Sequence, residues 1–235
     1  SPALAGAGTY TYTLTVAGCT DATASVTVSE QLQPNAGTNG ALTVCQGTVP
    51  TNADLFNSLS GTPDTGGTWS IVGLVYTYTV AATAPCTSDA AATVTVTEQV
   101  QPNAGSNGTL DICQGTTVTE AELFSALSGT PDAGGTWSPA LTGAGTYTYT
   151  VNAIAPCTGS SSASVIVSEQ QAPNAGTDGT LTVCAGTIPT DAELFAALNG
   201  TPQAGGSWLN VGLVYTYTVN AIAPCTADDV STVTS

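Results

Sequence analysis

Seven cysteines are the residues of this chain with the clearest chemistry, because a thiol can form a disulfide, bind a metal or act as a nucleophile. They are Cys19, Cys45, Cys86, Cys113, Cys157, Cys184 and Cys225. No two of them have the CxxC spacing of a zinc site, and the chain has no histidine that could complete one. We therefore expect disulfides, which indicate an oxidising compartment.

Two pairings of the cysteines agree with their spacing. In the first, each small domain closes its own bridge, with pairs Cys45–Cys86, Cys113–Cys157 and Cys184–Cys225, and the partner of Cys19 lies upstream. In the second, bridges join neighbouring domains, with pairs Cys19–Cys45, Cys86–Cys113 and Cys157–Cys184, and Cys225 is left over. The sequence favours the first, because a bridge across a loop of that size would stabilise a small domain by about 4 kcal/mol.

Side chains that carry oxygen atoms lie near the domain junctions, and such side chains are the ligands that calcium prefers. Each junction brings a glutamate at the end of one repeat close in sequence to Asn or Asp at the start of the next. The candidate ligands are Glu98, Asn103, Asn107, Glu169, Asn174 and Asp178. The alternative interpretation is a polar linker whose Asn residues form turns. The sequence favours that alternative, so we predict no resident metal or other cofactor.

Three tryptophans recur at equivalent positions, each after a Gly-Gly pair. They are Trp69, Trp137 and Trp208. One large indole per small domain predicts the centre of a hydrophobic core, because nothing else in the domain is large enough to fill it. The functional alternative is an exposed indole that stacks on a sugar ring.

The composition excludes several classes of function. The 235 residues include no Lys, Arg or His and 16 acids, for a formal charge of −16. Nucleic-acid binding and attraction to anionic lipid need cations, so neither is expected. No apolar run reaches the roughly 18 residues that span a membrane. Without a base, a cation or a metal site, we predict that the chain is not an enzyme.

An internal repeat of about 70 residues organises the chain. The tetrapeptide PNAG begins at Pro34, Pro102 and Pro173. The predicted domains are the C-terminal half of a repeat at 1–33, complete repeats at 34–101 and 102–172, and a repeat lacking its C-terminal tail at 173–235. We call these repeats one to four, and since repeat four lacks only its tail we count it below with the complete repeats. The chain is thus expected to be a segment of something longer.

Each repeat follows one order of elements, which predicts an all-β fold with one short helix. A strand ends at the first cysteine of each complete repeat, covering 41–45, 109–113 and 180–184. A helix follows, with N-cap candidates Thr51, Thr119 and Thr190 and an acid three residues later in each case. Glycines 61, 129 and 200 are its expected left-handed stops. The YTYTV strands and a last strand at 93–97, 164–168 and 231–235 complete the pattern.

The repeat motifs together carry a resemblance that covers the whole chain. In chain order they are CxGT, TxAELFxAL, GTPxAGGTW, GTYTYTV, APCT and ATVTVTEQ. They resemble the repeats of giant surface proteins from Bacteroidota and are similar to the repeat regions of SprB-type gliding-motility adhesins. The resemblance implies tandem Ig-like β-sandwich domains, export by the type IX pathway and a stalk or fibre. It brings no catalytic residues.

These observations together predict a structural stalk or fibre segment of a very long secreted cell-surface adhesin, used for surface attachment or gliding motility. Its expected partners are adjacent repeats of the same chain and, through regions outside this segment, an extracellular surface or glycan. Two alternatives from other classes remain open: a carbohydrate-binding repeat array, and an extracellular fibre that assembles itself through strand edges.

Overall fold

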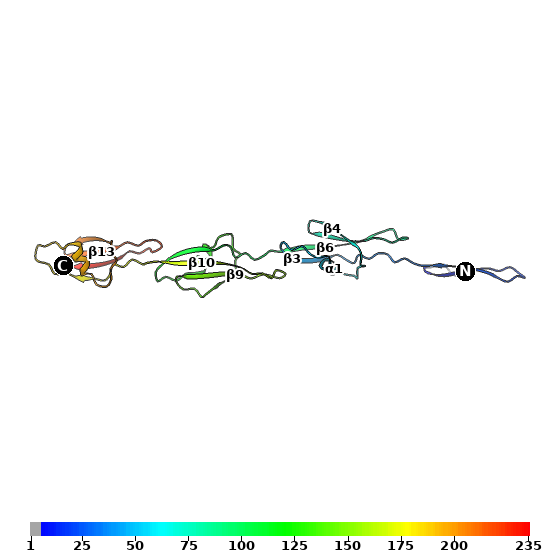
Figure 1. The fold of residues 1–235 in the computed structure, drawn as a ribbon, viewed down its shortest axis with the longest axis horizontal. Coiled ribbons are helices and arrows are strands. Elements are labelled where there is room, and N and C mark those ends of the chain that lie inside the picture. Colours follow the sequence, from blue (N-terminus) through cyan, green and yellow to red (C-terminus); the bar gives the residue numbers. More distant parts are fainter. Residues whose placement is uncertain (1–5) are drawn as a thin grey trace. The chain divides into compact units, whose positions relative to one another are not determined.

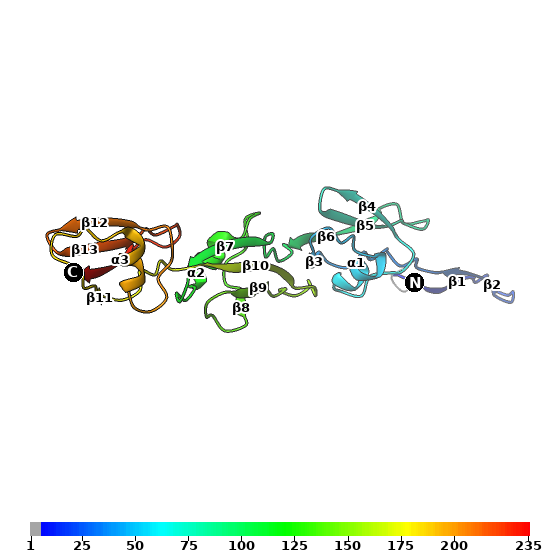
Figure 2. The same ribbon diagram turned by 60° about the vertical axis from the view of Figure 1, so that its left-hand side comes forward.

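The computed structural model of the chain describes residues 6–235. The same order of strands and one short helix occurs three times, which confirms the prediction of a mostly β protein built from tandem small repeats (Figures 1 and 2). Before the first complete repeat lies a two-stranded antiparallel sheet of β1 (Gly8–Leu14) and β2 (Ala22–Val28). No helix in the described part is long and apolar enough to cross a membrane.

The complete repeats contain equivalent elements. Repeat two comprises β3 (Gly40–Cys45), α1 (Asn52–Ser58), β4 (Thr68–Val72), β5 (Val75–Val80) and β6 (Ala90–Gln99). Repeat three comprises β7 (Gly108–Cys113), α2 (Glu120–Ala126), β8 (Thr136–Ser138), β9 (Gly145–Val151) and β10 (Ser161–Gln170). Repeat four comprises β11 (Gly179–Thr180), α3 (Asp191–Ala197), β12 (Ser207–Val211), β13 (Val214–Val219) and β14 (Asp229–Thr234).

Each complete repeat forms one four-stranded mixed sheet. The strand order in repeat two is β3-β6-β5-β4, and the other two repeats follow it. The last strand pairs antiparallel with the strand before it but parallel with the first strand. In this parallel register Gly40 lies opposite Val94 and Cys45 lies opposite Gln99. The first and last strands of a repeat therefore end at the same edge of the sheet.

Alternation along the last strand explains the core. In β10, Ala163, Val165 and Val167 are all buried, whereas Ile166 between them is exposed. The buried row packs against the two tyrosines of β9, against Leu123 of α2 and against Leu127, the residue that caps the C-terminal end of α2. Because repeats two and four use equivalent residues, each of the three repeats that contain a helix has its own small core.

The helices begin as the sequence predicted. The N-caps are Thr51, Thr119 and Thr190, and each forms a capping box with the acid three residues later. Their C-terminal ends differ from the prediction. Each helix ends at an extended leucine, Leu59 in repeat two, and the left-handed Gly61 lies two residues further on. Burial of this leucine ends the helix, because its side chain must turn into the core.

A β-sandwich needs two facing sheets, and the described residues contain one sheet per complete repeat. In place of a second sheet, the core is closed by the helix and by the PNAG lead segment. The lead is held by a single antiparallel bridge, Thr38 to Ser60 in repeat two. Gly40 permits this arrangement, because a β-carbon there would collide with the Ser58 carbonyl oxygen of α1.

The contacts divide the chain into two compact units that do not coincide with the sequence repeats. One contains the described residues up to Val100 together with Ala155–Cys157. The other contains Gln101–Ile154 and Thr158–Ser235. Three residues of repeat three thus belong with repeat two, and the reason is a disulfide.

Candidate functional site

The two disulfides of the described residues join successive repeats. Cys45 of repeat two is bonded to Cys157 of repeat three, with Cα atoms 4.8 Å apart. Cys113 of repeat three is bonded to Cys225 of repeat four, with the same Cα separation. Each bridge spans 112 residues of sequence. We call Cys45, Cys113 and Cys184 the first-strand cysteines, and Cys19, Cys86, Cys157 and Cys225 the turn cysteines.

Both pairings expected from the sequence are therefore wrong. The structure lacks the three bridges predicted within repeats, which were Cys45–Cys86, Cys113–Cys157 and Cys184–Cys225. It also lacks the three alternative bridges predicted between neighbouring repeats, which were Cys19–Cys45, Cys86–Cys113 and Cys157–Cys184. Cys19, Cys86 and Cys184 are free thiols. The observed bridges instead connect the first-strand cysteine of one repeat to the turn cysteine of the next.

The parallel pairing of first and last strands explains the error. Cys45 lies opposite Gln99, at the end of the ten-residue β6, whereas Cys86 precedes the start of that strand. A ten-residue strand is about 33 Å long. A disulfide needs Cα atoms within about 7 Å, so a bridge inside the repeat would require the sheet to be rebuilt.

Backbone oxygens of the linker lie beside each bonded turn cysteine. The sulfur of Cys157 lies 3.4 Å from the carbonyl oxygen of Gln99 and 4.0 Å from that of Val100. The sulfur of Cys225 lies 3.7 Å from the Gln170 oxygen and 3.9 Å from the Gln171 oxygen. We call these two residues, the last of the final strand and the one that follows it, the linker pair. The first-strand cysteine lies opposite the first member of the pair, so the bridge forms across the linker.

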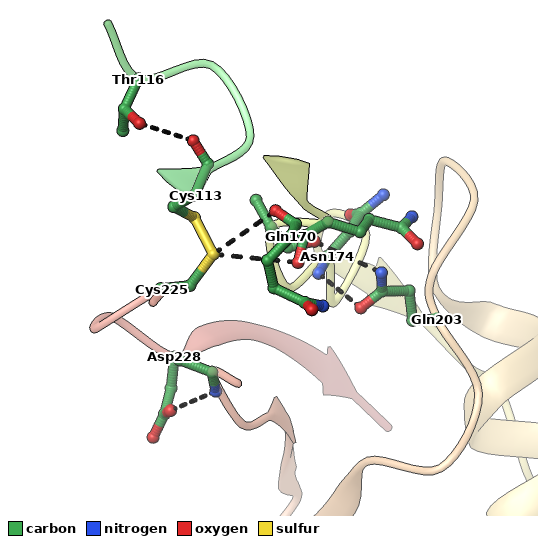
Figure 3. The surroundings of a disulfide bond; sticks show 10 residues. Cys113, Thr116, Gln170, Asn174, Gln203, Cys225 and Asp228 are labelled. Carbon is green, nitrogen blue, oxygen red and sulfur yellow. Dashed lines mark hydrogen bonds between the residues drawn. A yellow bond between two sulfur atoms is a disulfide. The ribbon is translucent and has the colours of Figure 1, made fainter. Parts of the chain in front are cut away.

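Figure 3 shows this arrangement around Cys113 and Cys225, with the linker residue Gln170 beside the sulfurs. The Thr116 hydroxyl donates to the Cys113 carbonyl oxygen at 2.7 Å and holds the turn after β7. Beyond the linker, the Asn174 backbone N–H donates to the side-chain oxygen of Gln203 at 3.1 Å. Hydrogen bonds thus fix the chain on both sides of the bridge.

An aromatic cluster lies at the other end of each sheet. In repeat three the ring centroids of Trp137 and Tyr149 are 5.0 Å apart, and Phe124 of α2 meets the same tyrosine edge-on at 5.5 Å. The Tyr149 hydroxyl accepts from the Gly135 N–H and donates to the Asp132 carbonyl oxygen. The most buried large side chain of the cluster is the tyrosine, and the half-buried tryptophan packs against it. Trp69 and Trp208 occupy the same place in their repeats.

The calcium candidates at the starts of the repeats have structural hydrogen bonds. The side-chain amide of Asn103 donates to the carbonyl oxygens of Gly129 and Thr130, and Asn107 accepts from the Ser164 N–H. Asn174 donates to the Thr201 carbonyl oxygen. Asp178 accepts from the Thr232 N–H at 2.7 Å, and this backbone hydrogen bond lowers the pKa of its carboxyl group. These side chains bind the lead segment to the rest of its own repeat.

The two glutamates also bond to backbone. Glu98 accepts from the Gly47 N–H at 3.2 Å, and Glu169 accepts from the Ala144 N–H at 3.4 Å. Within residues 6–235 no three acidic or sulfur-bearing side chains gather as a metal site would require. The hypothetical junction ligands are therefore distributed over separate backbone contacts.

No protein family matches the chain, and no curated protein is similar to it in sequence. The site must therefore be interpreted from its own geometry. Sequence reasoning found all four bonded cysteines but missed the linker pairs, whose contribution is made by backbone carbonyl oxygens. The one available signal was the recurrence of Gln at the first position of each linker pair.

Proposed function

We propose that this chain is a structural segment of a long extracellular surface protein, in which tandem repeats carry mechanical load. The observation that supports this is the pair of disulfides between successive repeats. A bridge that served only the stability of one small domain would close within it. One that joins two repeats also resists their separation.

The bridges shorten the covalent path that tension would follow. Force applied at the two ends can pass from residue 45 to 157, back along the chain to 113, and then to 225. Residues 46–112 and 158–224 lie outside that path, so they are shielded from pulling. The shielded segments include α1 with β4, β5 and β6, and α3 with β11, β12 and β13, whereas β3 and β14 lie on the path.

The wider setting of this proposal comes from the sequence. The motifs resemble Ig-like repeats of Bacteroidota surface adhesins, so we place the chain outside the cell, exported by type IX secretion and used in attachment or gliding. The absence of Lys and Arg removes the cleavage sites of trypsin-like proteases, which suits an exposed protein. The formal charge of −16 would keep neighbouring fibres apart.

Single-molecule pulling on the chain, held at its two ends, tests the load-bearing part. The oxidised chain should extend by about 100 residues, or about 340 Å, and the reduced chain by all 235 residues, or about 820 Å. Equal extension in both states would refute the proposal. Antibody labelling of intact source cells tests the location, and label found only after permeabilisation would contradict it.

A second candidate, lateral assembly into fibres, is favoured by one observation. The hairpin tips of repeats two and four expose apolar side chains, with Val72 83% and Val211 75% exposed. Exposed apolar surface that recurs in alternate repeats could pair copies of the chain side by side. Sedimentation at rising concentration tests this, with the variant Val72→Thr/Val211→Thr as the comparison. A chain that stays monomeric throughout would exclude it.

A further inference from the structure

The bridge between repeats three and four lies beside an acidic cavity. Cys113 and Cys225 both line this open cavity, which has a volume of about 550 Å³. Four carboxylate side chains line it as well, and Figure 3 includes one of them, Asp228, near the bridge. The four are Asp111, Glu122, Asp228 and Asp229. The chain has no Lys, Arg or His that could neutralise them. A small molecule that reaches this disulfide through the cavity therefore meets negative charge.

Hydrogen bonds hold three of these carboxylates in place. Asp228 and Asp229 each accept a hydrogen bond from a backbone N–H at 2.7 Å. Glu122 accepts from the hydroxyl and the backbone N–H of Thr119, and the hydroxyl is the larger cause of the lowered pKa of this carboxyl group. The negative charges beside the bridge are therefore fixed by the fold.

The first bridge, Cys45–Cys157, has an uncharged residue at three of the four equivalent positions. The equivalents of Asp111, Asp228 and Asp229 are Thr43, Ser160 and Ser161. Their structural roles agree where they can be compared, because Ser161 accepts from the N–H of Ala104 just as Asp229 accepts from the N–H of Ala175. The same positions thus carry hydroxyl groups at one bridge and carboxylates at the other.

In other respects the two bridges are alike. Their Cα separations are both 4.8 Å, and their turn cysteines, Cys157 and Cys225, are each 6% exposed. Both repeats also carry the helix acid and a glutamate before the linker pair, which are Asp54 and Glu98 in repeat two and Glu122 and Glu169 in repeat three. These shared acids do not distinguish the bridges, so the difference in charge lies at the other three positions.

We propose that the two bridges are unequal sites of thiol–disulfide exchange, and that small anionic thiols open Cys45–Cys157 before Cys113–Cys225. The species that attacks a disulfide is a thiolate, so nearby carboxylates repel it and slow the reaction. The first-strand sulfur is the expected point of attack, because Cys45 and Cys113 are half-buried whereas the turn cysteines are buried. The inference is drawn from the cavity and its charge and does not depend on a mechanical role.

The reaction at the first bridge consumes two equivalents of a small thiol. One thiolate attacks the Cys45 sulfur, a new disulfide forms between them, and Cys157 leaves as a thiolate that takes up a proton. A second thiolate attacks the small-molecule sulfur of the mixed disulfide and releases Cys45, which is also protonated. Two small thiols are thereby oxidised to one disulfide, the protein disulfide is reduced to two thiols, and the protons come from the small thiols.

Selective opening of the first bridge would redirect tension without releasing the whole chain. With both bridges closed, residues 46–112 and 158–224 are shielded. With only Cys113–Cys225 closed, residues 46–112 carry load and residues 114–224 are shielded. In that state α1 is exposed to pulling, whereas α2 and α3 are protected.

The test compares both bridges within one molecule. The whole chain with the substitutions Cys19→Ser, Cys86→Ser and Cys184→Ser keeps the two bridges and has no free thiol. It is treated at equal thiolate concentration with glutathione, whose thiolate is doubly negative, with 2-mercaptoethanol, whose thiolate is singly negative, or with cysteamine, whose thiolate is balanced by its ammonium group. Samples are quenched with iodoacetamide and cleaved at Asp and Glu, and mass spectrometry measures the initial rate at which each bridge opens.

The quantity of interest is the opening rate of the first bridge divided by that of the second. We expect this ratio to be about tenfold larger with glutathione than with cysteamine, and intermediate with 2-mercaptoethanol. The difference between thiols should vanish at about 1 M salt, where the Debye length falls to about 3 Å. A ratio that is the same for all three thiols, or a second bridge that opens first in glutathione, would overturn the proposal.

A swap of the charged positions between the bridges tests the assignment to particular residues. Asp111→Thr/Asp228→Ser/Asp229→Ser gives the second bridge the residues of the first, and Thr43→Asp/Ser160→Asp/Ser161→Asp does the reverse. The first set should bring the glutathione ratio close to the cysteamine ratio, and both sets together should invert it. A glutathione ratio that neither set changes would also overturn the proposal. The thiol series, which leaves the surroundings of both bridges unchanged, decides the matter even where a variant folds poorly.

Discussion

The two ends of each sheet are built on different principles. At the start of the last strand lies the aromatic end, where Trp, Tyr and Phe of one repeat pack together. At the end of the last strand lies the sulfur end, where the first-strand cysteine bonds to the next repeat. The aromatic end is complete within about 70 residues, whereas the sulfur end is complete only when a second repeat is present.

The repeats agree closely at the aromatic end. The Trp–Tyr centroid distances are 4.9, 5.0 and 4.8 Å in repeats two, three and four. In all three the tyrosine hydroxyl donates to a backbone carbonyl oxygen at 2.7 Å. At the sulfur end the repeats differ, since Cys45 and Cys113 are bonded and Cys184 is free. Folding of a repeat and connection of repeats are therefore separable properties.

Removal of one bridge is the strongest way to test that separation. Cys113→Ser/Cys225→Ser should lower the free energy of unfolding by about 4–5 kcal/mol, because a loop of more than 100 residues loses its cross-link. Urea unfolding followed by tryptophan fluorescence measures it, since Trp137 and Trp208 both belong to the same compact unit as the bridge. The control Cys86→Ser/Cys184→Ser removes two unbonded thiols and should change little. If both variants lose the same free energy of unfolding, the Cys113–Cys225 bridge is not what stabilises this unit.

Features of the aromatic end could be predicted from the sequence because they are local. The capping boxes need only a threonine and an acid three residues later, and all three formed as predicted. Alternation of apolar residues placed most strands, but the strand predicted at 180–184 is confined to Gly179–Thr180. The lead segments were predicted as turn-forming, and Asp132 and Gln203 hold them equivalently, because either side-chain oxygen can accept the backbone N–H.

The sulfur end could not be predicted in this way. Alternation places a strand but does not give its direction, and the parallel pairing of β3 with β6 decides which cysteines can meet. Spacing alone made the bridge inside a repeat the simplest hypothesis. The sandwich expectation failed to anticipate the single sheet for a related reason: a lead segment with one bridge, Thr38 to Ser60, has no strand pattern that distinguishes it from a loop.

Gly108→Ala tests how closely the first strand is fitted to the helix. A β-carbon at Gly108 would overlap the Ala126 carbonyl oxygen at the end of α2, and backbone on both sides leaves little room for adjustment. We expect a loss of about 3 kcal/mol. Gly159→Ala is the matched control, because a β-carbon there meets nothing within 4 Å. Thermal unfolding of both variants measures the difference, and similar melting temperatures would contradict the tight approach seen here.

Tyr149→Phe separates the hydrogen bonds of the aromatic end from its packing. The ring stays, but the Gly135 N–H and the Asp132 carbonyl oxygen lose their partner, which should cost about 1–2 kcal/mol. Tyr12→Phe, at a side chain that is 70% exposed, should be neutral. Urea unfolding measures both. If the effect is confined to repeat three, hydrogen exchange in repeat four will be unchanged, and a change there would show that the aromatic ends are coupled.

The smallest expected effect concerns the capping box of α2 and depends on pH. The Thr119 side chain and backbone N–H donate to Glu122, and the hydrogen bond from the side chain is the larger cause of the lowered pKa of that carboxyl group. A group whose pKa is lower in the folded state stabilises it above its unfolded pKa, and the contribution is lost as the pH falls through the folded value. Thr119→Val should therefore cost about 1 kcal/mol at pH 7, and the difference from the native chain should shrink below about pH 4.

Thr117→Val is the matched control, because the equivalent residues in repeats two and four are the exposed Val49 and Ile188. A Thr119→Val penalty that is the same at pH 3 and pH 7 would show that the hydroxyl caps the helix without help from the glutamate charge.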